Sequence, residues 1–258
     1  MKRGWEFLKQ PTARDIAPRN RQRGLSQAPV EYDYLVVCDL EWTVNHKSPP
    51  EVIEFGLVLL PLKGVKRPLS VKDIQTANCT EEIQLYCKPT EKPLLSQFIK
   101  DLTGISQETV DAAPTFDIQF KALKSWLITH KLIDSTGVKT CNWAICTWSD
   151  ADVQVIKNEV ERKEVGEFPE ALNAWINLKD DSYFKKVYRR PPRQGLENCC
   201  NTIAKVGFVG GAHSGIVDAR NTAAICVDMV NKGFRFVRTS RGFDKHGHMY
   251  GRQTFKKT

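Results

Sequence analysis

Two apolar runs near the start of the chain limit the folds that this sequence can adopt. Residues 34–40 (YLVVCDL) and 52–60 (VIEFGLVLL) are rich in aliphatic and β-branched side chains, which is typical of buried strands. The polar segment between them contains NHKSPP, which suits a hairpin connection. We therefore expect a buried β-hairpin at the start of a sheet.

The pattern of the remaining chain predicts a mixed sheet with helices. A third strand at residues 83–87 would extend the hairpin into three antiparallel strands, and the polar segment 63–80 indicates a loop or a short insertion before it. An initial meander followed by alternating helices and strands indicates an α/β fold with a mixed sheet, not a doubly wound parallel sheet. The further strands are expected at 139–145 and 173–178, and the helices at 93–99, 106–112, 115–130, 150–161, 196–207 and 218–231.

Four carboxylates and one histidine are the candidate chemical residues. Asp39 and Glu41 lie one residue apart at the end of the first apolar run. Two like charges in a half-buried position repel each other unless a cation neutralises them, so a bound divalent metal is the simplest explanation. Asp152 follows in TWSDADV, and His213 precedes Asp218 by five residues. Such a set can hold two Mg²⁺ ions, with His213 as the general base.

Each of these residues also has an ordinary interpretation. Spacing alone does not choose between Asp150 and Asp152. Asp218 could be a first-turn acid stabilised by the helix dipole, and His213 could be a surface or core histidine. Their joint occurrence in this order favours the catalytic interpretation.

Several ordered segments resemble the DEDDh 3′-to-5′ exonucleases of the RNase H-like fold. Together with DLE at 39–41, they resemble the "enhanced RNA interference" branch of that family, close to its Snipper-like members and the histone-mRNA 3′-end exonuclease, over about residues 31–240. The resemblance implies an RNase H-like mixed five-stranded sheet flanked by helices. The segments are LTGISQETVDAAPTF at 102–116, TWSDADV at 147–153, WINLKD at 175–180 and HSGIVDARNTA at 213–223.

The resemblance also implies roles for individual residues. Asp39, Glu41, Asp152 and Asp218 become the ligands of two Mg²⁺ ions, for which Mn²⁺ can substitute, and Glu41 acts with His213 in catalysis. His213 becomes the base that deprotonates the attacking water. The family pattern selects Asp152 and leaves Asp150 as a helix cap, and the implied product is a nucleoside 5′-monophosphate.

Other residues are candidates for holding the 3′-terminal nucleotide. An aromatic face can stack on a base, and short polar groups can bond to a ribose. For Leu102 and Ile105, core packing is the alternative role. Glu54, on the neighbouring strand, either supports the site or is a buried acid with another partner. The candidates are Trp42, Thr43, Leu102, Thr103, Gly104 and Ile105.

The chain departs from the family pattern at two positions. The family usually has Trp directly before the helix carboxylate, where this chain has Ala151, and Trp148 is a candidate replacement. The position before Asp218 is often a second acid, and here it is Val217. Neither departure removes a predicted metal ligand, so we expect activity.

The basic charge is concentrated at the two ends. The chain has 38 basic and 30 acidic side chains; residues 1–30 hold seven and two of these, and residues 231–258 hold eight and one, which leaves a net charge of −4 between them. We expect a basic arm at 1–30, an exonuclease domain at 31–232 and a basic tail at 233–258. Basic arms on an acidic, metal-binding body suit a polyanionic substrate, although they could act only in solubility.

The composition also bears on location. Eight cysteines without a CxxC motif favour free thiols in a reducing compartment, the nucleus or the cytoplasm. A mitochondrial location is less favoured, because the Arg-rich arm also contains acids. No run of eighteen apolar residues occurs, so we expect no membrane association through a spanning helix.

The main hypothesis is therefore a Mg²⁺- or Mn²⁺-dependent 3′-to-5′ exonuclease that acts on the 3′ ends of single-stranded RNA. DNA stays open as a second substrate, and protein partners stay open as a means of targeting. One alternative is a DNA-preferring exonuclease. Another is a catalytically silent nucleic-acid-binding module, which the presence of all five chemical residues disfavours.

Overall fold

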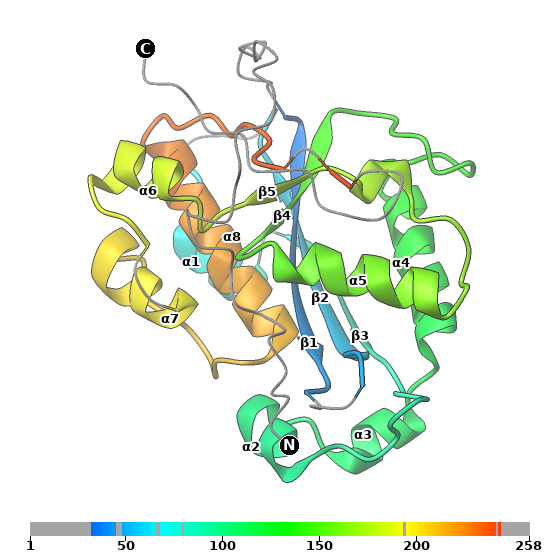
Figure 1. The fold of residues 1–258 in the computed structure, drawn as a ribbon. Coiled ribbons are helices and arrows are strands. Elements are labelled where there is room, and N and C mark those ends of the chain that lie inside the picture. Colours follow the sequence, from blue (N-terminus) through cyan, green and yellow to red (C-terminus); the bar gives the residue numbers. More distant parts are fainter. Residues whose placement is uncertain are drawn as a thin grey trace, which may run out of the picture.

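A five-stranded mixed sheet forms the centre of the molecule (Figure 1). In this computed structural model, the described residues are 32–44, 48–64, 68–78, 80–192, 195–240 and 242–243. The strand order is β3-β2-β1-β4-β5; β1 to β3 are antiparallel neighbours, and β4 and β5 run parallel to β1. This confirms the predicted fold class. The strands are β1 (Tyr34–Trp42), β2 (Val52–Pro61), β3 (Glu81–Tyr86), β4 (Trp143–Thr147) and β5 (Trp175–Asn177).

Helices cover both faces of the sheet (Figure 1). The helix α8 crosses one face together with α6 and α7, whereas α4 and α5 pack on the other. None of the helices within the described ranges is long and apolar enough to cross a membrane. The helices are α1 (Val71–Gln75), α2 (Gln97–Thr103), α3 (Gln107–Ala112), α4 (Phe116–Thr129), α5 (Ala151–Arg162), α6 (Asp181–Tyr188), α7 (Leu196–Asn198), which continues into a π-helical turn at Cys199–Ala204, and α8 (Gly215–Asn231).

The apolar run of β1 forms a strand because both of its faces are covered. Leu35 and Val37 pack in the core under α8, and Val36 and Cys38 pack in the core under α4 and α5. Side chains alternate along a strand, so a strand buried on both faces needs a nearly continuous apolar sequence. The alternation also directs Cys38 into the core, on the face opposite to Asp39.

Two helices lie where none was predicted. The helix α1 falls in the segment 63–80, for which we expect a loop or a short insertion, and Ser70 caps it by accepting a hydrogen bond from the Asp73 amide at 3.2 Å. The helix α6 follows β5, with Asp180 as its capping residue. Both begin with a local capping signal and are short, so neither shows an extended apolar periodicity. The strand expected at 139–145 begins later, at β4.

The segment after α8 packs onto the domain. Phe234 and Phe236 are buried in the core under α8, and the amides of Thr239 and Ser240 donate hydrogen bonds to the Trp175 carbonyl in β5. These residues belong to the segment 233–258 that we expected to be a basic tail, so its first part covers the β5 edge of the sheet. Most of that tail, and the arm at 1–30, lie outside the described residues.

Candidate active site at the carboxyl end of β1

The end of β1 presents two carboxylates. Asp39 and Glu41 are separated by one residue and therefore lie on the same face of the strand. Glu41 is paired with Glu54 of β2, and the register shifts between Glu41 and Trp42. Glu41 is buried, with 8% of its surface exposed.

Two glycines bring α8 close to these carboxylates. Gly56 of β2 is paired with Asp39, and a Cβ atom at position 56 would lie 2.2 Å from the carbonyl carbon of Gly215, the first residue of α8. A Cβ atom at position 215 would lie 3.1 Å from the Asp39 carbonyl oxygen. The start of α8 therefore rests almost directly on the strands, which only residues without a side chain allow. This approach places Asp218, in the first turn of α8, beside the end of β1.

Glu54 fixes the start of α8 to the sheet. Its fully buried carboxylate accepts hydrogen bonds from the amides of Gly215 at 3.0 Å and Ile216 at 3.2 Å, and from the Gln84 side chain at 2.7 Å. The first amides of a helix have no partner within the helix, and an anion is stabilised there. Glu54 therefore supports the framework of the site.

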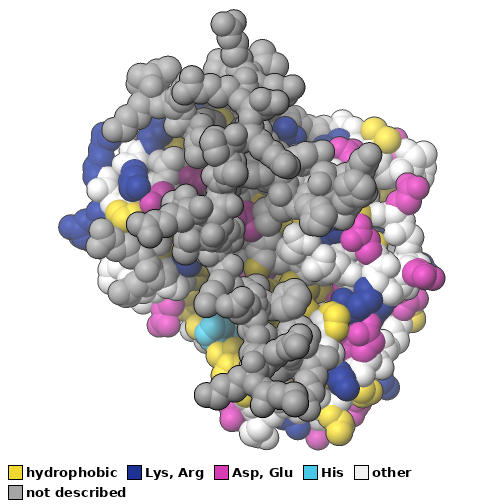
Figure 2. Space-filling view, viewed as in Figure 1, with side chains coloured by type: hydrophobic (Ala, Val, Ile, Leu, Met, Phe, Trp, Pro, Cys, Tyr) yellow, Lys and Arg dark blue, Asp and Glu magenta, His cyan; other side chains and the backbone are white. Residues whose placement is uncertain are grey.

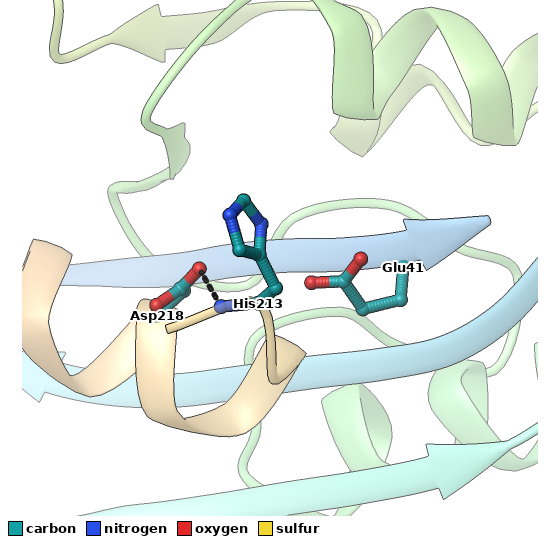
Figure 3. A group of neighbouring side chains, drawn as sticks. All are labelled: Glu41, His213 and Asp218. Atoms are coloured by element: carbon teal, nitrogen blue, oxygen red, sulfur yellow. Dashed lines mark hydrogen bonds between the residues drawn. The ribbon is translucent and has the colours of Figure 1, made fainter. Parts of the chain in front are cut away.

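Three side chains from β1, α8 and the loop that precedes α8 meet closely. Figure 3 shows the His213 side chain beside the carboxylates of Glu41 and Asp218, and ligand atoms of the three residues lie within 4.8 Å of one another. The His213 amide donates a hydrogen bond to Asp218 Oδ2 at 3.1 Å, and His213 has a left-handed backbone with φ of 63°. Asp218 therefore holds the backbone of the histidine that stands over it.

Asp152 also lies beside β1, and it belongs to α5, which packs on the face of the sheet opposite to α8. It lies in the first turn of α5, is 3% exposed, and its Oδ1 atom accepts a hydrogen bond from the Leu40 amide at 3.2 Å. Asp39 lies next to Leu40, and its pKa is raised first by burial and then by the charges of Asp152 and Asp218. Asp39 and Asp152 thus join the same electrostatic cluster, although they lie outside the closest group of three.

The N-cap position expected for Asp150 is confirmed, without the side-chain hydrogen bond of a cap. Asp150 occupies the N-cap position of α5, but its side chain makes no capping hydrogen bond and instead accepts one from the Trp175 indole nitrogen at 2.9 Å. The backbone of Asp150 has helical dihedral angles. A capping side chain typically needs an extended backbone at this position, which accounts for the missing capping bond at Asp150.

Burial raises the pKa values of all four carboxylates. It raises the pKa of Glu41 to about 8, that of Asp152 to about 7 and that of Asp218 to about 6. For Asp39, burial and then the charges of Asp152, Asp218 and Glu41 raise the pKa well above its usual range. The cluster therefore disfavours its own full ionisation unless positive charge is bound.

The donor set fits a divalent cation. Asp218 Oδ1 is buried and has no hydrogen-bond partner among the described residues, so this oxygen is available as a ligand. Carboxylate oxygens are the ligands that Mg²⁺ and Mn²⁺ prefer. The residues that could hold such ions are Asp39, Glu41, Asp152 and Asp218, with His213 beside them.

The two candidates that follow Glu41 already have partners within the protein. Trp42 is half-buried and packs against the core under α4 and α5. Thr43 is 6% exposed, and its hydroxyl accepts a hydrogen bond from the Glu51 amide at 3.0 Å. Both lie at the end of β1, next to the carboxylates.

The segment 102–105 is divided between core and surface. Ile105 packs with Ile53 in a small core, and the Thr103 hydroxyl is buried and donates to the Ile99 carbonyl at 2.8 Å. Leu102 is half-buried, and Gly104 is exposed with a left-handed backbone that ends α2. Core packing is therefore correct for Ile105, while Leu102 and Gly104 have surface to offer a ligand.

The structure shows the surroundings of the two positions that depart from the family pattern, Ala151 and Val217. Trp148, the candidate replacement for the aromatic residue missing at Ala151, is half-buried, and its ring packs edge-on against Phe184 of α6 at 5.8 Å. Val217 lies under the loop that precedes His213, where a Cβ atom at Gly210 would be 2.9 Å from Val217 Cγ1.

Sequence reasoning missed the residue that fixes the loop before His213. Asn221 of α8 is fully buried; its side chain donates to the carbonyls of Val209 and Val217 and accepts from the Val209 amide and from Gln75 of α1. All of these bonds measure between 2.9 and 3.1 Å. A polar residue among the apolar positions of an otherwise buried helix was the available signal.

Comparisons with known proteins identify the family of this chain. The model of the Exonuclease family matches residues 36–226. The chain is 35% identical to human ERI1 exoribonuclease 2 over 239 residues, which is 85% of this chain but 32% of that protein. It is 30% identical over 222 residues to the Drosophila melanogaster 3′-5′ exonuclease Snipper, which is 80% of this chain and 72% of that protein. The chain thus spans about a third of the length of the human relative.

Solved structures share the fold of this chain. The nuclease domain of 3′hExo, a DEDDh family member, matches with a TM-score of 0.65 and 26% identity over 82% of this chain and 98% of that one. A full-length 3′-exonuclease matches with a TM-score of 0.69 and 25% identity over 86% of this chain and 91% of that one. The chain therefore belongs to the Exonuclease family, and its resemblance to the DEDDh, "enhanced RNA interference" branch is confirmed.

Proposed function

We propose that this protein is a metal-dependent 3′-to-5′ exonuclease that hydrolyses phosphodiester bonds of RNA and releases nucleoside 5′-monophosphates. The observation that carries the proposal is the meeting of Glu41, His213 and Asp218, whose ligand atoms lie within 4.8 Å of one another in a chain of the Exonuclease family. DNA remains the second substrate class, because no described contact distinguishes a ribose from a deoxyribose.

The four carboxylates would hold two Mg²⁺ ions, for which Mn²⁺ can substitute. When bound, such ions neutralise the phosphodiester and lower the pKa of an attacking water. His213 is the base: it is exposed, and its imidazole nitrogen would take the proton of that water. The Asp218 carboxylate, which binds the His213 amide, keeps this side chain at the edge of the site. Asp152 is held at β1 by the Leu40 amide and completes the set of acids.

The 3′-terminal nucleotide would lie between the end of β1 and the α2 segment. The helices α2 and α3 lie beyond the carboxyl end of β1 (Figure 1). Leu94 and Phe98 are 81% and 61% exposed, so they can stack on or cover a base together with Trp42 and Leu102. Thr43, Thr103 and Gly104 are the other proposed contacts, and Ile105 supports their segment from the small core. A relative of known structure binds rAMP, which supports a ribonucleotide.

Basic side chains of the domain offer a second contact with the nucleic acid. Figure 2 shows Lys and Arg side chains gathered over α6, and Lys185, Lys186, Arg189 and Arg190 are all exposed there. Asp181 neutralises Lys185 through an ion pair at 2.9 Å. Exposed cations favour phosphate, so this surface would bind the strand upstream of its 3′ end, in addition to the basic arm and tail.

The cellular setting is also a proposal. The seven cysteines that lie in the described ranges form no disulfide, which suits the nucleus or the cytoplasm. The partners would be the 3′ ends of single-stranded RNA or DNA, with other proteins supplying targeting.

A time course on labelled substrates tests the proposal. A 5′-labelled single-stranded RNA and its DNA counterpart are incubated with Mg²⁺, with EDTA, and with the Asp39→Ala variant. We expect a ladder that shortens from the 3′ end and is abolished by EDTA and by the substitution. Intact substrate that remains bound, equally in EDTA, would instead indicate a silent binding module.

A further inference from the structure

One buried carboxylate gathers the loop that leads into α2. Glu51, directly before β2, is fully buried, and its side chain accepts hydrogen bonds from three consecutive amides. These are the amides of Thr90 at 2.7 Å, Glu91 at 3.1 Å and Lys92 at 2.9 Å. Three amides converging on one ionised group fix the path of a loop far more tightly than single contacts do.

The same carboxylate is joined to α5. The Lys163 ammonium lies 2.8 Å from Glu51 and 2.6 Å from Glu159, a fully buried residue of α5. Glu159 in turn accepts a hydrogen bond from the Val52 amide at 2.7 Å. Burial alone would raise the pKa of Glu51, but the bonds from Lys163 and the loop amides outweigh it and lower the pKa, so the carboxylate stays ionised. The start of β2, the 90–92 loop and the end of α5 therefore share one charged centre.

Glu51 is also bonded to the end of β1. The Thr43 amide donates to the Glu51 carbonyl at 2.8 Å, and the Glu51 amide donates to the Thr43 hydroxyl at 3.0 Å. Thr43 lies two residues beyond Glu41. On its other side, the 90–92 loop continues into Leu95 and α2, which pack on Ile53 in the small core that also contains Ile105. One residue thus links the carboxylate end of β1 to the α2 segment.

We propose that Glu51 is a positioning residue, which sets the distance between the α2 segment and the acidic site and thereby the binding of the 3′-terminal nucleotide. It acts through the 90–92 loop and touches neither metal nor substrate. The inference rests on the proposed function, because it assumes that the nucleotide lies between α2 and the end of β1. If Glu51 had a purely structural role, its substitution would lower stability and would not weaken nucleotide binding more than metal binding.

The test compares Glu51→Gln with Glu159→Gln in the full chain. Glutamine at position 51 keeps the size of the side chain but turns an NH₂ group toward amides that need an acceptor. The control removes the other buried partner of Lys163 and leaves the loop contacts in place. The readouts are kcat and KM on a 5′-labelled RNA, calorimetric binding of adenosine 5′-monophosphate with Mg²⁺, binding of Mn²⁺ alone, and hydrogen exchange of residues 90–105.

We expect Glu51→Gln to raise KM and weaken binding of the monophosphate about tenfold, equivalent to about 1.4 kcal/mol, and to speed exchange at 90–92. Its kcat and Mn²⁺ affinity should change less than about twofold, and Glu159→Gln should leave KM within about twofold. Equal effects of both variants on KM, or unchanged exchange at 90–92, would overturn the proposal. If Glu51→Gln does not fold, Glu51→Asp retracts the charge by one methylene and must give the same separation.

The exchange measurement keeps this inference separate from the proposed function. A wild-type protein without activity would refute the exonuclease proposal. Slow hydrogen exchange at 90–92 that is lost on substitution of Glu51 would still establish that Glu51 holds this loop. Only a change in nucleotide binding would establish that the loop positions the nucleotide.

Discussion

Metal binding should release protons, and the number released follows from the burial of the acids. At pH 7 a carboxyl with a pKa of about 8 is about nine-tenths protonated, one with about 7 is half protonated, and one with about 6 is about one-tenth protonated. Ligands must be ionised to bind a cation. Glu41, Asp152 and Asp218 together should therefore release about 1.5 protons, and Asp39, whose pKa is also raised by burial, can only add to this number.

Calorimetry with Mn²⁺ in two buffers of different ionisation enthalpy measures this number without substrate. We expect at least about 1.5 protons at pH 7 and fewer at pH 9, and a loss of about 0.9 proton in Glu41→Gln. Glu167→Gln, a change of an exposed acid, is the matched control and should match the wild type. Metal binding with no proton release at pH 7, or the same release in Glu41→Gln, would refute the reasoning.

Further predictions concern stability and catalysis. The folded acids keep protons that the unfolded chain loses above about pH 4, so in EDTA the melting temperature should fall as pH rises from about 4 to 8; a rise would contradict this. Gly56→Ala should lower the free energy of unfolding by about 1–3 kcal/mol, whereas Gly195→Ala, with open space around it, should not; equal melting curves would count against the close approach of α8. Glu54→Gln should cost about 1–3 kcal/mol in chemical denaturation and reduce activity as well, and wild-type values for both would exclude its anchoring role. His213→Asn should lower kcat by about 10²–10⁴ with RNA binding retained, and a loss below tenfold would exclude a role as base.

The parts of the fold that depend on extended apolar patterns could be predicted from the sequence. The strands β1 and β2 are long apolar runs that are buried almost throughout, and α4 has apolar residues at helical spacing on its buried face. The short helices α1 and α6 could not be predicted in this way, because a five- or eight-residue helix is specified by its cap and its tertiary contacts.

The acids could be identified from their order, but the contacts that hold them could not. Gly56 is one of sixteen glycines in the sequence, and nothing local distinguishes the one that lies under α8. Glu54 was noticed as a buried acid, yet its partners at Gly215 and Ile216 lie about 160 residues away. Such long-range partners are set by the packing of α8 on the sheet, which a single sequence does not encode in any short pattern.

The most direct test of the central claim is the chemical identity of the product. Mass spectrometry of the material released from a single-stranded RNA in the presence of Mg²⁺ should detect nucleoside 5′-monophosphates from the 3′ end, and the Asp218→Asn variant should release none. Nucleoside 3′-phosphates, internal fragments, or equal release by the variant would contradict the proposed active site.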